Sequence, residues 1–143
     1  MDYRTRGQSP RIVVPRPDRV RRIGPSGFGW LDAGLLHEGW LQVLTGKEMA
    51  IYAFLCLAAD RQGVSWYRRR RIGEVLGIPE PEVHAALERL AELDLVAYAP
   101  FRRGAADGFH QVLSLPTGGP LAPPPREQIR GLVAQLADRW RQR

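Results

Sequence analysis

The sequence predicts a mainly α-helical domain of the α+β class, with a small β-hairpin and an added C-terminal helix. Three observations lead to this prediction. Apolar residues recur at helical spacing through consecutive stretches between residues 46 and 93. Two short β-prone runs, residues 95–101 and 109–115, then flank a glycine-containing loop, which is the pattern of a hairpin. A last apolar stripe at helical spacing covers residues 126–141, beyond a segment rich in proline.

Length and composition suit a single packed core. The chain has 143 residues, of which 44% are hydrophobic and 8% aromatic. The longest apolar run, residues 49–59, is well short of the roughly 20 residues that a helix needs to cross a bilayer. The N-terminal arginines precede no apolar stretch, so we expect no secretory signal and a cytosolic location. The single cysteine, Cys56, excludes a disulfide framework and is expected to be a buried, inert thiol.

Charge divides the chain into segments. The net charge is +6, and the positive charge gathers at the two ends. Residues 1–27 hold seven arginines against two aspartates, and residues 126–143 hold five arginines against two acids, which leaves the middle slightly acidic. We therefore predict a basic extended arm over 1–27, a core domain over 28–115, a stiff Pro/Gly linker over 116–125 and an amphipathic helix over 126–143. A basic chain of this kind favours a polyanionic partner such as nucleic acid.

The core begins with an apolar lead-in and a central helix. Residues 28–44 carry leucines and tryptophans spaced as a short helix followed by a packed segment. A capping box at Thr45–Glu48 predicts a helix start, with the helix running from about Gly46 to Asp60. Its residues are apolar nearly all round, as expected of a helix surrounded by other elements. Four aromatic side chains at core-like spacings are expected to pack rather than to stack on bases: Trp30, Trp40, Tyr52 and Trp66.

Two further helices are expected before the hairpin. Residues 68–76 form a short helix with an inner face of Ile72, Val75 and Leu76, and Gly77 is placed as its C-terminal stop. The next helix opens with Pro81 in its first turn, where proline is tolerated. Its apolar stripe consists of Val83, Ala86, Leu87, Leu90 and Leu93.

These elements resemble a known family. The sequence contains Ser65-Trp66-Tyr67, Ile72-Gly73-Glu74-Val75-Leu76-Gly77-Ile78, Ala86-Leu87-Glu88-Arg89-Leu90 and Leu93-Asp94-Leu95-Val96. In this order they resemble the helix-turn-helix core of prokaryotic winged-helix proteins, which include MarR-like regulators and replication-initiator and replisome-organiser groups. The lead-in from Trp30 to Leu55 is similar to that of the replication-type members. The resemblance covers residues 28–115, and it implies a winged helix-turn-helix that binds double-stranded DNA through its third helix and wing.

In the geometry that the resemblance implies, the third helix lies in the major groove and its exposed N-terminal side chains read bases. Those positions are Glu80, Glu82, His84, Ala85, Glu88 and Arg89. Three carboxylates there would be repelled by the phosphates that line the groove, and glutamate reads bases only in the minority contact to cytosine. This departure from the family pattern leaves open a third helix that faces a protein partner instead.

Arginines elsewhere are the candidate phosphate contacts. Arg68, Arg69, Arg70 and Arg71 open the second helix, which crosses the DNA backbone in this geometry. The alternative for this quartet is a solvated helix face with one arginine capping or pairing with Glu74. Arg102 and Arg103 lie at the wing tip, where the alternative is ordinary solubility. Arg19, Arg21 and Arg22 belong to the arm, which enters a minor groove, tracks phosphates or is simply a tail.

No enzyme is expected, and no cofactor or metal. The three histidines, His37, His84 and His110, are far apart and no cysteine cluster accompanies them. Ser26, Ser65 and Ser114 lack the surroundings of a nucleophile, and no Walker lysine is present. The sequence therefore predicts a non-catalytic protein, for which transcriptional regulation, replication initiation and mobile-element maintenance remain open as roles.

The apolar face of the C-terminal helix must pack on something, because an isolated helix of this length is marginal in water. It either docks on the protein's own core or forms a homodimer or partner interface, and we favour self-association. The competing hypothesis for the whole protein is an interaction module that docks into a larger nucleoprotein complex through its acidic third helix and this C-terminal helix. The interface residues would be Ile129, Leu132, Val133, Leu136 and Trp140.

Overall fold

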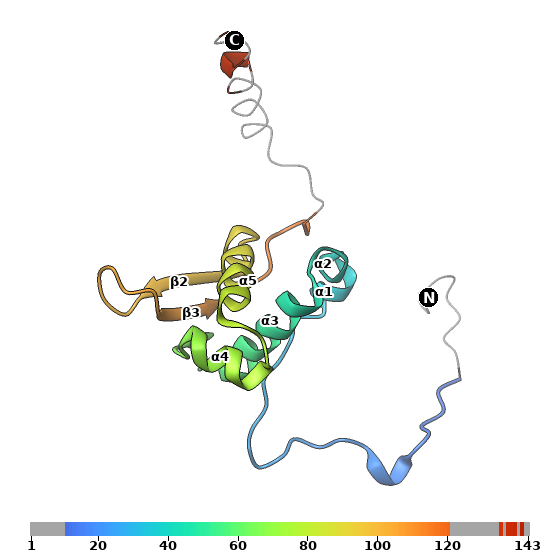
Figure 1. Cartoon of the computed structure of the whole chain (residues 1–143). Helices are drawn as coiled ribbons and strands as arrows, with labels where there is room; N and C mark the ends of the chain where they lie inside the picture. Colours follow the sequence, from blue (N-terminus) through green and yellow to red (C-terminus); the bar gives the residue numbers. More distant parts are fainter. Residues whose placement is uncertain (1–10, 121–134, 136, 140, 142–143) are drawn as a thin grey trace.

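A computed structural model describes residues 11–120, 135, 137–139 and 141. It confirms an α+β domain in which helices pack around a small antiparallel sheet (Figure 1). Among the described residues, no helix has both the length and the apolar character needed to cross a membrane. The elements are η2 (Pro17–Arg19), α1 (Gly34–His37), α2 (Trp40–Val43), α3 (Gly46–Ala58), β1 (Val64–Ser65), α4 (Arg69–Leu76), α5 (Glu80–Glu92), β2 (Val96–Pro100) and β3 (Gly108–Val112).

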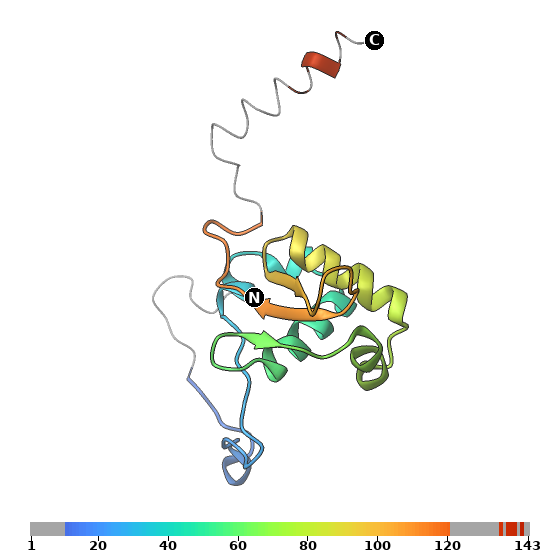
Figure 2. The same ribbon diagram turned by 90° about the vertical axis from the view of Figure 1, so that its left-hand side faces the viewer.

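The sheet has a strand that the sequence analysis missed. The predicted hairpin is present as β2 and β3, with Val96 opposite Val112 and Pro100 opposite Gly108, but both strands are shorter than expected. The two-residue strand β1 adds to the other edge of β3, so the order is β1-β3-β2, and Figure 2 shows β1 beside β3. Two residues are too few to show a period of two, so only the pairing of Val64 with Gln111 reveals this strand.

The central helix α3 follows from its capping box. The Thr45 hydroxyl accepts a hydrogen bond from the Glu48 amide at 3.2 Å, and the Glu48 carboxylate accepts one from the Thr45 amide at 2.9 Å. The helix buries Ile51, Tyr52 and Leu55 and contacts α4, α5, β1 and β3. It is not covered by other elements on every side, as was expected from its apolar residues, because its last turn leaves Leu57 70% exposed.

The turn between α4 and α5 depends on two glycines. Gly77 ends α4 with φ of 67°, the left-handed conformation that glycine adopts without a Cβ clash. Gly73, one turn earlier, lies under the turn, and a Cβ built there would be 2.4 Å from the Ile78 carbonyl oxygen. The backbone of the turn therefore packs directly on the helix, which sets the angle at which α5 leaves α4.

We expect Gly73→Ala to lower the free energy of unfolding by about 2 kcal/mol, because the added methyl group forces the Ile78 carbonyl outward. The matched control is Gly46→Ala at the start of α3, where an added Cβ meets nothing within 4 Å. This control should be neutral or slightly stabilising. Urea denaturation of the two variants and the parent chain checks the prediction, which fails if both variants behave alike.

The lead-in differs from the expectation in its aromatic residues. Instead of one short helix, α1 and α2 are two single turns separated by Gly39, whose φ is 86°. Trp40 and Tyr52 are buried as predicted, but Trp30 is 72% and Trp66 58% exposed. The predicted core role of these two tryptophans is therefore wrong, because both lie in segments outside helices and strands that skirt the core.

The predicted basic arm and the predicted C-terminal helix lie at the two ends of the chain. Residues 11–28 are exposed throughout, and Figure 1 shows residues 11–27 leading away from the domain. Of the predicted C-terminal helix, Gln135, Ala137, Asp138, Arg139 and Arg141 are helical. Its expected interface residues lie outside the described residues: Ile129, Leu132, Val133, Leu136 and Trp140.

Candidate nucleic-acid interface

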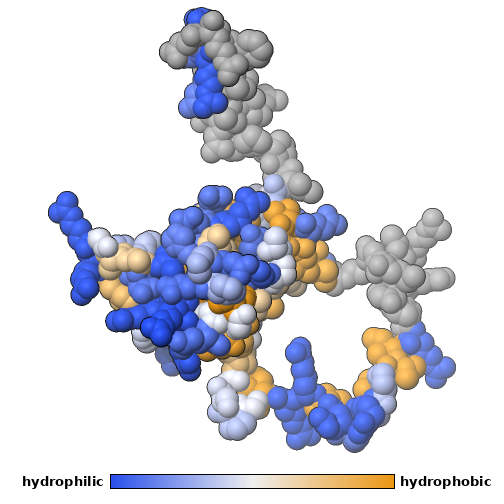
Figure 3. All heavy atoms as spheres, in the orientation of Figure 1, coloured by the Kyte–Doolittle hydropathy of each residue, from blue (hydrophilic) through white to orange (hydrophobic). Residues whose placement is uncertain are grey.

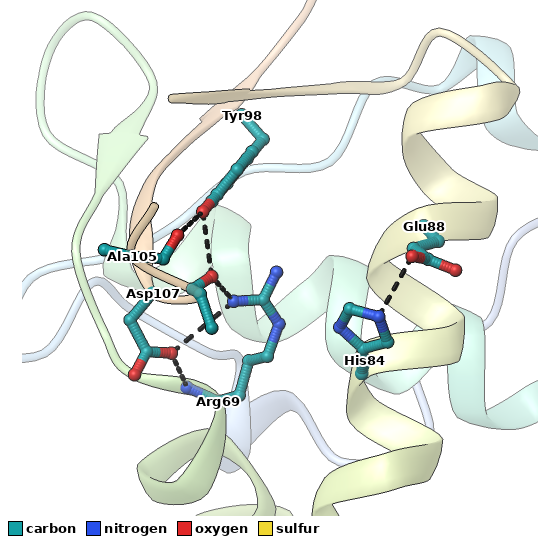
Figure 4. A network of polar contacts seen from close by, with 7 residues as sticks. Arg69, His84, Glu88, Tyr98, Ala105 and Asp107 are labelled. Atoms are coloured by element: carbon teal, nitrogen blue, oxygen red, sulfur yellow. Dashed lines mark hydrogen bonds and ion pairs between the residues drawn. The ribbon is translucent and has the colours of Figure 1, made fainter. Parts of the chain in front are cut away.

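The loop of the β2–β3 hairpin, residues 101–107, is fastened to the start of α4 by a buried arginine. Arg69 is the first residue of α4 and is only 8% exposed. Its backbone amide donates to the Asp107 carboxylate at 3.1 Å, and its guanidinium Nη1 lies 3.5 Å from the same oxygen and also donates to the Ala106 carbonyl. Figure 4 shows these groups converging between the hairpin loop and the helix. Asp107 thus satisfies a helix-start amide from a distant part of the chain.

Tyr98 on β2 completes this junction. Its hydroxyl lies 3.1 Å from the Ala105 carbonyl oxygen and 2.8 Å from that of Ala106, so it donates to the hairpin loop (Figure 4). The Arg69 guanidinium carbon also lies 5.4 Å from the centre of the Tyr98 ring, within range of a cation–π interaction. The last three residues of the loop, 105–107, are therefore held from two sides, by α4 and by β2.

This arrangement corrects the predicted role of Arg69. An arginine buried against Asp107 and a carbonyl is not available to a DNA phosphate. Helical spacing explains the inward direction, because position 69 shares a face with the buried Ile72 and Gly73 three and four residues later.

The other members of the quartet are exposed. Arg70 and Arg71 both pair with Glu74, at 3.4 and 3.3 Å, which matches the alternative of a solvated helix face. Such exposed pairs contribute little to stability. Arg68 precedes α4 as its N-cap residue, is exposed, and has no ion pair within residues 11–120.

A cleft of about 450 Å³ opens between the start of α4 and the hairpin loop. Arg102 and Arg103 are exposed on the loop and, like Arg68, have no carboxylate partner among the described residues. The cleft brings together Arg68 and Arg102, which are far apart in sequence, while its one carboxylate, Asp107, is already engaged by Arg69. Its lining consists of Arg68, Phe101, Arg102, Ala105, Ala106 and Asp107.

The predicted base-reading positions on α5 lie away from the cleft, and most of them are paired with neighbouring side chains. His84 lies 2.9 Å from Glu88, and Arg89 lies 3.8 Å from Glu92 (Figure 4 shows the first pair). Glu82 pairs with Lys47 at the start of α3. Ala85, the residue after His84, is exposed. No α5 residue lines the cleft, and the exposed face of α5 carries more carboxylates than arginines.

His110 lies beneath the same junction. It is 2% exposed, and its ring centre is 5.3 Å from that of Tyr98. Burial, the largest cause, and the Arg69 charge together lower the pKa of His110 to about 4, and the Asp107 charge partly opposes them. Among the described residues its Nδ1 atom has no hydrogen-bond partner, so the fold favours the neutral ring.

The depressed His110 pKa predicts that the fold weakens in mild acid. Between pH 6.5, near which an unfolded histidine titrates, and about pH 4, the unfolded chain binds a proton that the folded chain does not. The free energy of unfolding should therefore fall by about 2 kcal/mol from pH 7 to roughly pH 4.5 through this group alone. In His110→Phe this part of the loss should vanish. Urea titrations at the two pH values test it, and equal losses in both proteins would contradict it.

The arginines of the arm that were predicted to contact phosphates are exposed: Arg19, Arg21 and Arg22. Arg16 is different, since its guanidinium pairs with Asp18 at 2.7 Å and holds the pKa of that carboxyl below its usual range. The structure does not bring residues 11–27 of the arm to the cleft, because none of them lines it.

The sequence analysis missed the groups that build the junction. Tyr98 and Asp107 were assigned only to a strand and a loop, and no local pattern marks a loop aspartate as the cap of a helix 38 residues away. The described residues also contain a second cavity of about 490 Å³, beside Trp30, Asp32, Tyr52 and Cys56. Cys56 is only partly buried, and burial raises its pKa. No group of three or more His, Cys, Asp or Glu in the described part of the chain is arranged to hold a metal ion.

Comparison of the chain with models of protein families, with curated proteins and with solved structures gave no match.

Proposed function

We propose that this protein is a non-catalytic, cytosolic winged helix-turn-helix protein that binds double-stranded DNA. Its phosphate contacts are Arg68, Arg102 and Arg103, together with the arginines of the arm. The hairpin loop acts as the wing, and α4 and α5 form the helix-turn-helix.

The order of elements supports this assignment. A helix, a short strand, two helices around a glycine turn and a hairpin follow one another as α3, β1, α4, α5, β2 and β3. Together with the resemblance of the α4–α5 sequence, this order fits the winged-helix architecture. In the usual docking geometry of such a domain, the helix before the turn crosses the DNA backbone and the helix after it enters the major groove.

The observation that carries the proposal is the group of unpaired arginines at the cleft. Arg68 comes from the start of α4 and Arg102 from the loop, yet both line one cleft and neither is neutralised by a described carboxylate. Guanidinium groups bind phosphate through paired hydrogen bonds, and free charges on two separate elements can contact successive phosphates. The buried Arg69–Asp107 contact keeps the two elements at a fixed separation.

The acidic exposed face of α5 limits what kind of DNA binding is proposed. With Glu80, Glu88 and Glu92 exposed there, insertion of α5 into the major groove would place carboxylates beside phosphates. We therefore propose binding through the backbone, which fixes position but carries little sequence information.

The double variant Arg102→Ala/Arg103→Ala tests the proposed contacts. Removal of two phosphate contacts should weaken duplex binding about tenfold and reduce the slope of log K against log salt by about 2. The matched control is Arg61→Ala, which removes an exposed arginine that lies away from the cleft. Fluorescence anisotropy with a labelled duplex provides the measurement. Equal affinities of the double variant, the control and the parent chain would remove Arg102 and Arg103 from the proposed site.

A second candidate function is a protein-interaction module, favoured by the carboxylates that α5 exposes. In this case a basic partner protein covers α5, and the C-terminal segment joins copies or partners through its apolar stripe. Light scattering of the full chain should give a dimer mass that becomes a monomer mass in Leu132→Asp/Leu136→Asp. A stoichiometric protein partner that is lost in Glu88→Ala/Glu92→Ala, with no duplex binding at low salt, would favour this candidate over DNA binding.

A further inference from the structure

Two phenylalanines are exposed on the hairpin beside the cleft. Phe101 begins the loop after β2, and Phe109 lies in β3, where it pairs with Ala99. They are 38% and 42% exposed, and their rings meet edge to face with centres 5.1 Å apart. Each ring therefore supports the other while both keep exposed surface. Figure 3 shows pale apolar surface bordered by hydrophilic side chains at the end of the domain that carries this hairpin.

The charged groups around this phenylalanine pair are arginines that have no carboxylate partner among the described residues. Phe101 lines the same cleft as Arg68 and Arg102, and Arg103 follows in the loop. The carboxylate in the cleft, Asp107, is held by the Arg69 amide and guanidinium. An aromatic surface flanked by unpaired arginines thus opens into a cleft of about 450 Å³, which is within the range of pockets that hold small ligands.

An exposed aromatic surface of this kind contributes little to the binding of duplex DNA. The bases of a duplex are stacked on one another, so a protein surface outside the grooves meets the phosphates. Arginine binds phosphates without the help of an aromatic ring. An unpaired nucleotide presents both a phosphate and a free base face. Aromatic rings that stack on bases next to basic groups are the usual means of binding single strands.

We propose that the hairpin binds single-stranded DNA, with an unpaired base stacked on Phe101 and with Arg68 and Arg102 at the flanking phosphates. Phe109 supports Phe101 from its edge. This inference rests on the proposed DNA binding and deepens it, because it assigns a preference of the same cleft for unpaired over paired nucleotides. Arg68 and Arg102 contact both duplex and single-stranded DNA, whereas the phenylalanines contribute only to binding of the single strand.

The test compares a labelled oligothymidine with a labelled duplex of equal length, by fluorescence anisotropy at fixed low salt. Phe101→Leu keeps an apolar side chain and removes the ring, so oligothymidine binding should weaken by about five- to a hundredfold. Duplex binding should change by less than about twofold. Phe101→Tyr restores a ring and should bind the oligothymidine nearly as well as the parent chain, which separates loss of stacking from damage to the loop.

Phe28→Leu is the matched control, since Phe28 is 70% exposed and lines the other cavity. It should leave both affinities unchanged. If the duplex binds but Phe101→Leu weakens oligothymidine binding no more than Phe28→Leu does, the single-strand assignment is overturned while the proposed function stands. If neither DNA binds the parent chain at low salt, the proposed function falls and this inference falls with it. Capture of a protein by the aromatic pair, with unchanged DNA binding in Phe101→Leu, would also overturn it.

Discussion

Arg69→Ala is expected to lower the free energy of unfolding by about 3 kcal/mol, a large fraction of the stability of a small domain. The substitution leaves the Asp107 carboxylate and the Ala106 carbonyl without their guanidinium partner in a part-buried site. It also removes the cation that lies over the Tyr98 ring. Because an unpaired charge at such a site costs more than a missing contact, the loss should far exceed that for an exposed arginine.

Arg70→Ala provides the matched comparison for this prediction. Arg70 is the next residue of the same helix, its side chain is 83% exposed, and its pairing with Glu74 is of the surface kind. We expect its removal to change stability by less than about 0.5 kcal/mol. Arg69→Lys should recover only part of the loss, because an ammonium group cannot reproduce the planar, multiple donor geometry of guanidinium. Urea denaturation gives all three values, and similar stabilities for Arg69→Ala and Arg70→Ala would contradict the proposed junction.

Duplex binding should depend steeply on salt. If each proposed arginine neutralises one phosphate, log K falls against log salt with a slope of about −5. Raising the salt from about 50 to about 200 mM then weakens binding by about a thousandfold. The arginines counted are Arg19, Arg21, Arg22, Arg68, Arg102 and Arg103.

The salt series also separates the arm from the cleft. Substitution of Arg19, Arg21 and Arg22 by alanine should halve the slope and leave the stability unchanged, because residues 11–28 are exposed and bury nothing. A slope near zero in the parent chain would mean that few phosphates are neutralised, which is incompatible with the proposed contacts. A slope smaller by about 1 in Arg61→Ala would instead show that the positive charges act without regard to position.

The helices were predictable because their signals are local. The capping box at Thr45 and Glu48 and the stop at Gly77 each involve residues within one turn of a helix end, and both are present in the structure. The apolar stripe of α5 is likewise buried at Val83, Ala86, Leu87 and Leu90. Spacing along one helix places such residues on one face. In α4 the spacing was less reliable, because Val75, expected on the inner face, is 50% exposed.

The junction at the cleft was not predictable because it joins distant segments. Four consecutive arginines look equivalent in a sequence, but helical geometry turns Arg69 inward and leaves Arg68, Arg70 and Arg71 at the surface. That direction could have been inferred from the spacing to Ile72 and Gly73. Its partners could not, because the pairing with Asp107 and the ring of Tyr98 depends on where the hairpin folds back.

Mapping of backbone amide shifts during titration with a short duplex tests the central claim most directly. With the chain labelled with ¹⁵N, we predict that the largest chemical-shift changes occur at Arg68 and in the hairpin loop around Arg102 and Arg103. The amides of α5 around Ala85 and Glu88 should change little. Shifts confined to the exposed face of α5, or no shifts at low salt, would contradict the account.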